Sequence, residues 1–153
     1  MNALASFNRL KNLPGGTRLF SRGVCIAAPY FSSIKPHVEV LEPDLARVSI
    51  KKRRAVTNHL GTVHAIAMCN MAELAGGLMT DVSIPPTHRW IPKGMTVEYL
   101  KKAGTDLVAT ARPTTTPDFS QAGEYPVQVE VTDTLGTPVF RALITMWVSP
   151  KKA

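Results

Sequence analysis

Apolar and polar residues alternate along six short stretches of the chain, and one longer stretch is apolar on every side. The alternation is clearest where Ala46, Val48 and Ile50 are interleaved with polar neighbours, a pattern typical of a strand that buries one face. Strands are predicted within residues 37–54, as a pair joined at 42–44, and at 95–100, 106–112, 127–133 and 139–148. Runs of strands without regularly alternating helices predict an antiparallel sheet, so the predicted fold class is α+β.

The apolar stretch from Thr62 to Thr80 predicts a helix that is buried nearly all round, with Thr62 as its N-cap. A sheet that curls around this helix would cover every side of it. Gly76 and Gly77 are expected to let another element pack closely. Glu73 is a single carboxylate in the middle of this stretch. Because burying an ionised carboxylate without partners costs several kcal/mol, Glu73 calls for a specific role.

The predicted sheet is preceded by a separate N-terminal segment. Residues 3–13 predict a short amphipathic helix that stops at the sequence LPGG, and a loop-rich stretch follows to Pro36. Residues 83–94 contain three prolines and are expected to be a connection without regular structure. We therefore expect an N-terminal helix and loop extension over residues 1–36 and one domain over residues 37–153.

Positive charge is concentrated in the first part of the chain. The net charge is +7, and residues 1–60 hold ten Lys and Arg against three acidic residues, so the whole excess lies there. The densest point is the run KKRR at residues 51–54. This run is typical of a solvated strand end, of a site for a phosphate-bearing ligand such as coenzyme A, or of nucleic-acid binding. Nucleic acid is the weakest of these, because no zinc-finger spacing, aromatic RNA-binding strand or basic recognition helix accompanies the charge.

The remaining composition favours a cytoplasmic protein without metal. Cys25 and Cys69 are too few for a disulfide framework, and neither has a second ligand at zinc-site spacing. No apolar run reaches the length of a membrane span. Residues 1–33 contain Arg and Lys but no acid, as transit peptides do, yet they lack the apolar segment of a secretory signal, and no cleaved leader is expected.

Two chemical features meet on the predicted helix. Ile66, Asn70, Glu73 and Gly77 follow one stripe at spacings of four, three and four residues. The start of the helix, near residues 63–66, has backbone N–H groups without intrahelical partners, which can bind a developing oxyanion. A carboxylate and an oxyanion donor therefore share one helix.

The residues around this helix resemble the hotdog-fold acyl-CoA thioesterases, in particular the phenylacetyl-CoA type. That family has an Asn six residues before a His and a catalytic carboxylate nine residues after it, and Asn58, His64 and Glu73 keep both spacings. Two positions depart from the family pattern: Ala65 and Ile66 replace Gly-Gly, and Glu73 replaces Asp. The resemblance implies a hotdog fold, an antiparallel sheet wrapped around one long helix.

The resemblance also implies roles for individual residues. The N–H of Ala65 would polarise the thioester carbonyl, Glu73 would act as general base or nucleophile, and Asn58 would orient the water or the carboxylate. His64 would hold the loop rather than transfer protons. Two structural alternatives stay open: Glu73 as a carboxylate bonded to Asn70 or to a partner chain, and Asn58 as a turn residue before Gly61.

The implied ligand is an acyl-CoA, with no metal and no cofactor beyond the coenzyme A of the substrate itself. Candidate contacts to its phosphates are Arg53, Arg54, Lys101 and Lys102. The implied assembly is a homodimer joined edge to edge through the sheet, or a dimer of such dimers.

Two other functions compete with thioester hydrolysis. A hotdog hydratase or dehydratase is disfavoured because no HFPG-like segment is present. A non-catalytic acyl-CoA or lipid binding protein stays open, because both departures from the family pattern fall at the site.

Overall fold

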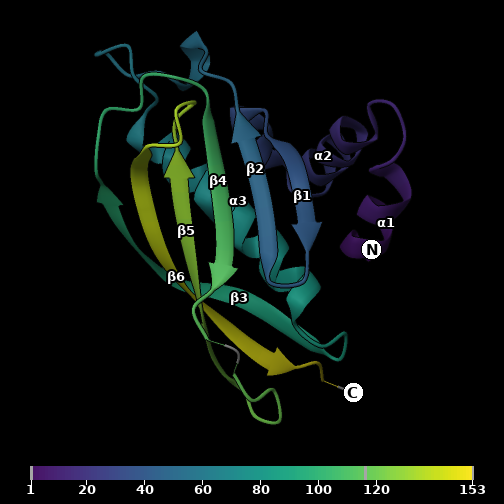
Figure 1. Cartoon of the computed structure of the whole chain (residues 1–153). Helices are drawn as coiled ribbons and strands as arrows, with labels where there is room; N and C mark the ends of the chain where they lie inside the picture. The colour runs from purple at the N-terminus through teal and green to yellow at the C-terminus, as the bar shows by residue number, and fades with distance from the viewer. Residues whose placement is uncertain (1, 116, 153) are drawn as a thin grey trace.

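The computed structural model describes residues 2–115 and 117–152, which form one curled sheet with a long helix against its inner face (Figure 1). The strands are β1 (His37–Glu42), β2 (Leu45–Ile50), β3 (His88–Tyr99), β4 (Leu107–Pro113), β5 (Gly123–Thr132) and β6 (Pro138–Pro150). The helices are α1 (Ala3–Leu10), α2 (Gly16–Ala27) and α3 (Ala65–Ser83), with 3₁₀ turns η1 (Pro29–Ile34) and η2 (Arg54–Val56). The predicted α+β class and hotdog arrangement are confirmed.

The six strands form a single sheet in the order β1-β2-β4-β5-β6-β3. Every neighbouring pair is antiparallel, as predicted. The first and third strands of the chain therefore lie at opposite edges, and four strands separate them. Because the long helix follows β2 and leads into β3, the chain crosses from the second strand of the sheet to the opposite edge through α3.

Alternating burial along the strands builds the core between the sheet and α3. Val127, Val129 and Val131 of β5 are fully buried, whereas the residues between them are more exposed. A fully buried aliphatic side chain of this size contributes about 1.5–3 kcal/mol. The period of two in the sequence therefore fixed which face of each strand meets the helix.

Two glycines let the sheet approach α3 closely, as the sequence predicted. A Cβ atom on Gly76 would lie 2.9 Å from Cδ1 of Ile144, and one on Gly77 would lie 2.8 Å from the Trp90 ring. Both distances are shorter than a normal carbon contact. Gly77 therefore makes room for the Trp90 indole, whose Nε1–H donates to Asp81 at 3.2 Å.

The predicted surroundings of α3 were wrong in two respects. The N-cap is His64 rather than Thr62, and the helix extends to Ser83. Glu73 and Ile66 are exposed, so one side of the helix is left uncovered by the chain. The sheet therefore does not enclose α3 on every side.

Two segments that were expected to lack regular structure are regular. Residues 88–94 belong to β3 despite Pro92, which an edge strand tolerates because one side of its backbone needs no partner. Residues 16–27 form α2 rather than a loop. This helix packs Phe20 edge-to-face on Phe7 of α1 at 5.1 Å between ring centroids, so tertiary contact stabilises it despite three glycines in or beside it.

None of the helices in the described segments has both the length and the hydrophobicity needed to cross a membrane.

Candidate functional site

The loop before α3 is held by Asn58. Its Oδ1 accepts the N–H groups of Leu60 at 3.0 Å and Thr62 at 3.2 Å, and its Nδ2 donates to the Thr62 hydroxyl at 3.0 Å. Gly61 sits in the same turn with a φ of +73°, a conformation that glycine adopts without strain. The structure thus gives Asn58 the turn-forming role that the sequence left open, and these side-chain bonds all stay inside the loop.

The start of α3 is capped by the His64 side chain. Its Nδ1 accepts the N–H of Ile66 at 3.0 Å, which requires the proton of a neutral ring to be on Nε2. The same bond uses one of the free N–H groups of the helix start. The N–H of Ala65, at the first helical position, has no acceptor within the described residues. The predicted oxyanion donor is therefore available, next to a capped helix end.

The residues predicted to form one stripe on α3 lie in two different environments. Ile66, which is 56% exposed, and Glu73 lie on the open side of the helix. Asn70 is only 6% exposed and donates from Nδ2 to the Ser33 hydroxyl of η1 at 3.1 Å. In the part of the chain that the structure describes, the Glu73 carboxylate has no hydrogen bond or ion pair, so the alternative of a Glu73 bonded to Asn70 is not realised there.

The inner face of β3 provides an apolar surface beside this open side. Met95 lies directly opposite the buried Ile144 of β6 and therefore points toward α3. Tyr99, which is 51% exposed, places its hydroxyl 3.5 Å from Sγ of Cys69. This hydrogen bond, with some burial, raises the pKa of Tyr99. Together with the contact between Trp90 and Gly77, it sets β3 against both ends of the helix segment that carries Glu73.

No sequence pattern pointed to Cys69 and Tyr99 as parts of this site. Met95 and Tyr99 lie on a strand whose first half was predicted as a loop, so the register that points them toward α3 was unknown. Only the pairing of β3 with β6 reveals which of its side chains share a face with Glu73.

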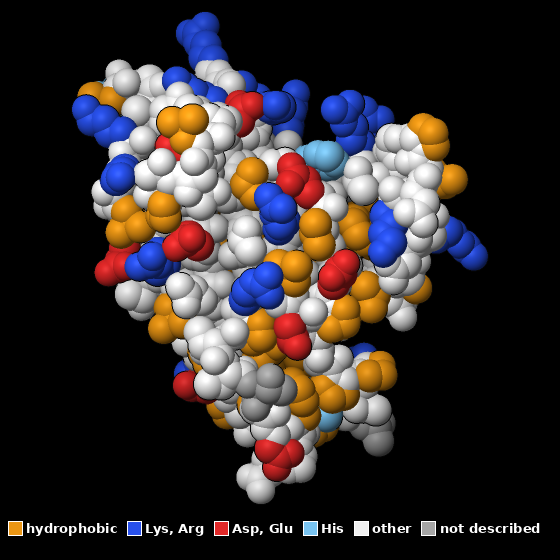
Figure 2. Space-filling model, in the orientation of Figure 1, with side chains coloured by type: hydrophobic (Ala, Val, Ile, Leu, Met, Phe, Trp, Pro, Cys, Tyr) orange, Lys and Arg blue, Asp and Glu red, His pale blue; other side chains and the backbone are white. Residues whose placement is uncertain are grey.

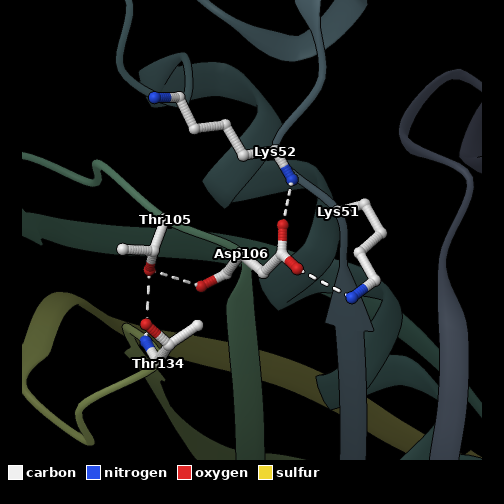
Figure 3. Close-up of polar contacts among 5 residues, drawn as sticks. All are labelled: Lys51, Lys52, Thr105, Asp106 and Thr134. Carbon is white, nitrogen blue, oxygen red and sulfur yellow. Dashed lines mark hydrogen bonds and ion pairs between the residues drawn. The ribbon is translucent and has the colours of Figure 1, made fainter.

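The first two residues of the run KKRR, Lys51 and Lys52, bond to Asp106 just before β4 (Figure 3). Nζ of Lys51 lies 2.7 Å from Oδ2 of Asp106, and the N–H of Lys52 donates to its Oδ1 at 2.8 Å. The bond with Lys51 and the bond with the Lys52 backbone lower the pKa of Asp106. Next to Asp106, the hydroxyl of Thr105 accepts the N–H of Thr134 at 3.1 Å. Lys51 and Lys52 thus fix the end of β2 to the start of β4.

The four predicted phosphate contacts lie at the same end of the molecule as the start of α3. The N–H of Val63 donates to the carbonyl of Ala103 at 2.8 Å, which joins the loop before α3 to the connection that carries Lys101 and Lys102. Figure 2 shows Lys and Arg side chains along the upper edge of this face, where Figure 1 places both segments.

These cations differ in their freedom. Lys101, Lys102 and Arg54 are exposed. Arg53 is partly buried and donates from Nη2 to the carbonyl of Ser33, and its buried Nε has no acceptor among the described residues. Three of the four predicted contacts therefore face solvent, and Arg53 is directed toward η1.

Within residues 2–115 and 117–152, no group of three or more His, Cys, Asp or Glu is arranged to hold a metal ion.

One known protein family matches most of the chain. The model of the family described as a domain of unknown function, DUF4442, matches residues 16–148. The chain belongs to this family. The match includes α2 as well as the sheet and α3, so α2 is part of the DUF4442 domain. No curated protein matches the chain.

Solved structures agree with this assignment. The structural-genomics protein APC5556 is 47% identical, with a TM-score of 0.85 over 97% of this chain and 99% of that chain. PA5026 of Pseudomonas aeruginosa, described as a probable thioesterase, is 23% identical, with a TM-score of 0.73 over 91% of this chain and 97% of that one. The thioesterase HI1161 of Haemophilus influenzae is 12% identical, with a TM-score of 0.74 over 84% and 87%. The last two likenesses show that this DUF4442 protein shares its fold with proteins named thioesterases.

Proposed function

We propose that this DUF4442 protein hydrolyses acyl-CoA thioesters to a free acid and coenzyme A. The Glu73 carboxylate would activate water as a general base or attack the thioester carbon as a nucleophile. The Ala65 N–H, at the positive end of α3, would hold the developing oxyanion. The observation that carries the proposal is the exposed Glu73 carboxylate, which has no partner among the described residues and lies on the same open side of α3 as Ile66.

The position of the apolar residues supports an acyl substrate. Ile66 is exposed on α3, the helix that carries Glu73, and Met95 and Tyr99 are exposed on β3. An acyl group placed against them would leave water, and its thioester would lie near the helix start. Arg54, Lys101 and Lys102 face solvent at the same end, where the phosphates of coenzyme A would emerge.

The spacing along α3 supports a site shared by two copies of the chain. Ala65 and Glu73 are eight residues apart, which is about 12 Å along a helix axis. A Glu side chain spans only part of this distance, so one thioester fits poorly between both groups of one helix. Pairing of two β3 edges about a two-fold axis would bring the open sides of two α3 helices together. Glu73 of one protomer would then act opposite Ala65 of its partner.

Release of free thiol from short, medium, long and aromatic acyl-CoAs tests the proposal. Glu73→Gln keeps the size of the side chain but removes the base, so turnover should fall by at least about a hundredfold. Glu42→Gln, at the exposed end of β1, is the matched control and should turn over normally. Circular dichroism checks that each variant is folded.

Two outcomes would contradict hydrolysis by this site. Unchanged release from folded Glu73→Gln would show that the carboxylate is not the catalytic group. Saturable binding of acyl-CoA without any thiol release would instead support the non-catalytic binding protein.

A further inference from the structure

A cavity separate from the α3 site lies between α2, η1 and the adjoining ends of β1 and β2. Figure 1 shows α2 beside β1, at the end of the sheet opposite to β3 in the strand order. The cavity, called here the α2 groove, has a volume of about 750 Å³. It is lined by Arg18, Ser21, Arg22, Cys25, Ile26, Ser32, Lys35, Pro36, His37, Ser49 and Lys51.

The α2 groove is lined by four cationic side chains and no carboxylate. Lys51 is already paired with Asp106. In the segments that the structure describes, Arg18, Arg22 and Lys35 have no ion-pair partner. No acidic residue precedes Glu39 in the chain, so no nearby element of the N-terminal segment balances this charge. The groove therefore has an unbalanced positive potential suited to an anion.

The placement of the two arginines is unfavourable for α2 by itself. Arg18 and Arg22 are four residues apart, so they share one helix face and repel each other. Arg18 also lies in the first turn, where the helix dipole disfavours a positive charge. Both effects reverse when an anion sits between the side chains. The repulsion between the two arginines and the charge in the first turn thus coincide at one concave site. Locally unfavourable features of this kind are typical of functional sites.

An apolar surface continues the same helix face. Ile26 follows Arg22 by four residues and is 80% exposed, although it is a large aliphatic side chain. Cys25 and Pro36 line the groove beside it. A ligand that fits both halves has an anionic end for the arginines and an apolar portion for Ile26.

We propose that the α2 groove binds a phosphate ester that carries an apolar group, with Arg18 and Arg22 on the phosphate. The planar guanidinium groups match phosphate oxygens in paired hydrogen bonds, and Lys35 adds a third charge. The site is separate from α3 and does not depend on thioester hydrolysis. Its ligand is either a soluble phosphate ester or the headgroup of a phospholipid in a bilayer.

Binding of octyl phosphate and of inorganic phosphate to the full chain is measured by calorimetry. Octyl phosphate should bind more tightly than inorganic phosphate, because only its alkyl chain covers Ile26. The double variant R18Q/R22Q should weaken binding of octyl phosphate at least about tenfold, because two charge-assisted contacts are lost. The control R47Q/R112Q removes the same charge from the outer face of the sheet and should bind normally.

The two cysteines provide a second readout in the same molecule. Cys25 lines the groove, whereas Cys69 lies on α3 beside Tyr99. Octyl phosphate in the groove should slow alkylation of Cys25 and leave the rate at Cys69 unchanged. Protection of Cys69 alone would place the ligand elsewhere and overturn the proposal.

Vesicles distinguish the two sources of the phosphate. Sedimentation with phosphatidylglycerol vesicles but not with phosphatidylcholine vesicles, abolished in R18Q/R22Q, would assign the groove to a bilayer headgroup. Octyl phosphate binding without sedimentation would assign it to a soluble ester. Equal weakening by both double variants would show a general charge effect, and it would overturn the proposal, as would the absence of saturable binding to every probe.

Discussion

The two edge strands of the sheet, β1 and β3, differ in how far the rest of the chain covers them. At β1 the N-terminal segment covers the edge: the Ser21 hydroxyl of α2 accepts the N–H of Val38 at 2.8 Å, and Thr17 bonds to the His37 ring at 2.9 Å. At β3 no element of the described chain pairs with the outer side of the strand. Its residues from Arg89 to Tyr99 are almost all exposed, including Ile91 and Tyr99.

An uncovered, partly apolar edge of this length invites pairing with another strand, whereas an edge capped by side chains does not. The contrast assigns different uses to the two ends of the molecule. The β3 edge and the open side of α3 are suited to a second copy of the chain. The start of the β1 edge is bonded to α2, and the α2 groove lies beside it.

The largest expected effect is at the open edge. Met95→Lys places a charge on the face of β3 that the proposed dimer buries, and an unpaired buried charge costs several kcal/mol. The dissociation constant of the dimer, measured by analytical ultracentrifugation, should rise more than about a hundredfold. Leu135→Lys, in the exposed turn between β5 and β6, is the control and should leave the dimer intact. A dimer of Met95→Lys with unchanged affinity would place the interface elsewhere.

A smaller effect is expected at the covered edge. Ser21→Ala leaves the buried N–H of Val38 without its acceptor, which should lower the free energy of unfolding by about 1–3 kcal/mol. Urea denaturation measures this change. Ser6→Ala on α1, whose side chain caps nothing in the described structure, should change it by less than about 0.5 kcal/mol. Equal effects of both variants would mean that the Ser21 bond does not secure this edge.

The smallest effect appears only at high pH. Burial, together with the charge of Asp44 in the turn between β1 and β2, raises the pKa of Tyr125 to about 12. The unfolded chain loses this proton near pH 10, so stability from Tyr125 is complete below about pH 10 and falls as the pH rises to about 12. Urea midpoints across this range measure the loss. Tyr125→Phe should flatten this part of the pH profile, and an identical slope in both proteins would contradict the pKa shift.

The strands with regular alternation could be predicted from the sequence because one face of each is buried by a near neighbour. Five of the six were placed to within four residues, and so was the long helix. The first half of β3 and the whole of α2 were missed. Proline in β3 and glycines around α2 are unfavourable locally, and the pairing with β6 and the packing of Phe20 on Phe7 outweigh them.

The candidate site was predictable in its residues but not in its surroundings. The spacing of Asn58, His64 and Glu73 pointed to the loop before one helix, its start and its middle, and the structure places the three residues there. Asn58 proved to be bonded within its own loop, and Glu73 proved to be exposed. An apolar helix sequence shows that most sides are covered, but it does not show which side is left open.

The sequence by itself determined the α+β class, the inward faces of the regular strands, the close packing at Gly76 and Gly77, and the place of the Glu73 carboxylate in the middle of the central helix. These properties depend on local periodicity and side-chain size. Only the tertiary structure decided that β3 rather than β1 is the open edge, that Tyr99 meets Cys69 on α3, and that Arg18 and Arg22 line a groove. Each of these depends on which distant segments meet, because strand order and register are set by contacts between residues far apart in the chain.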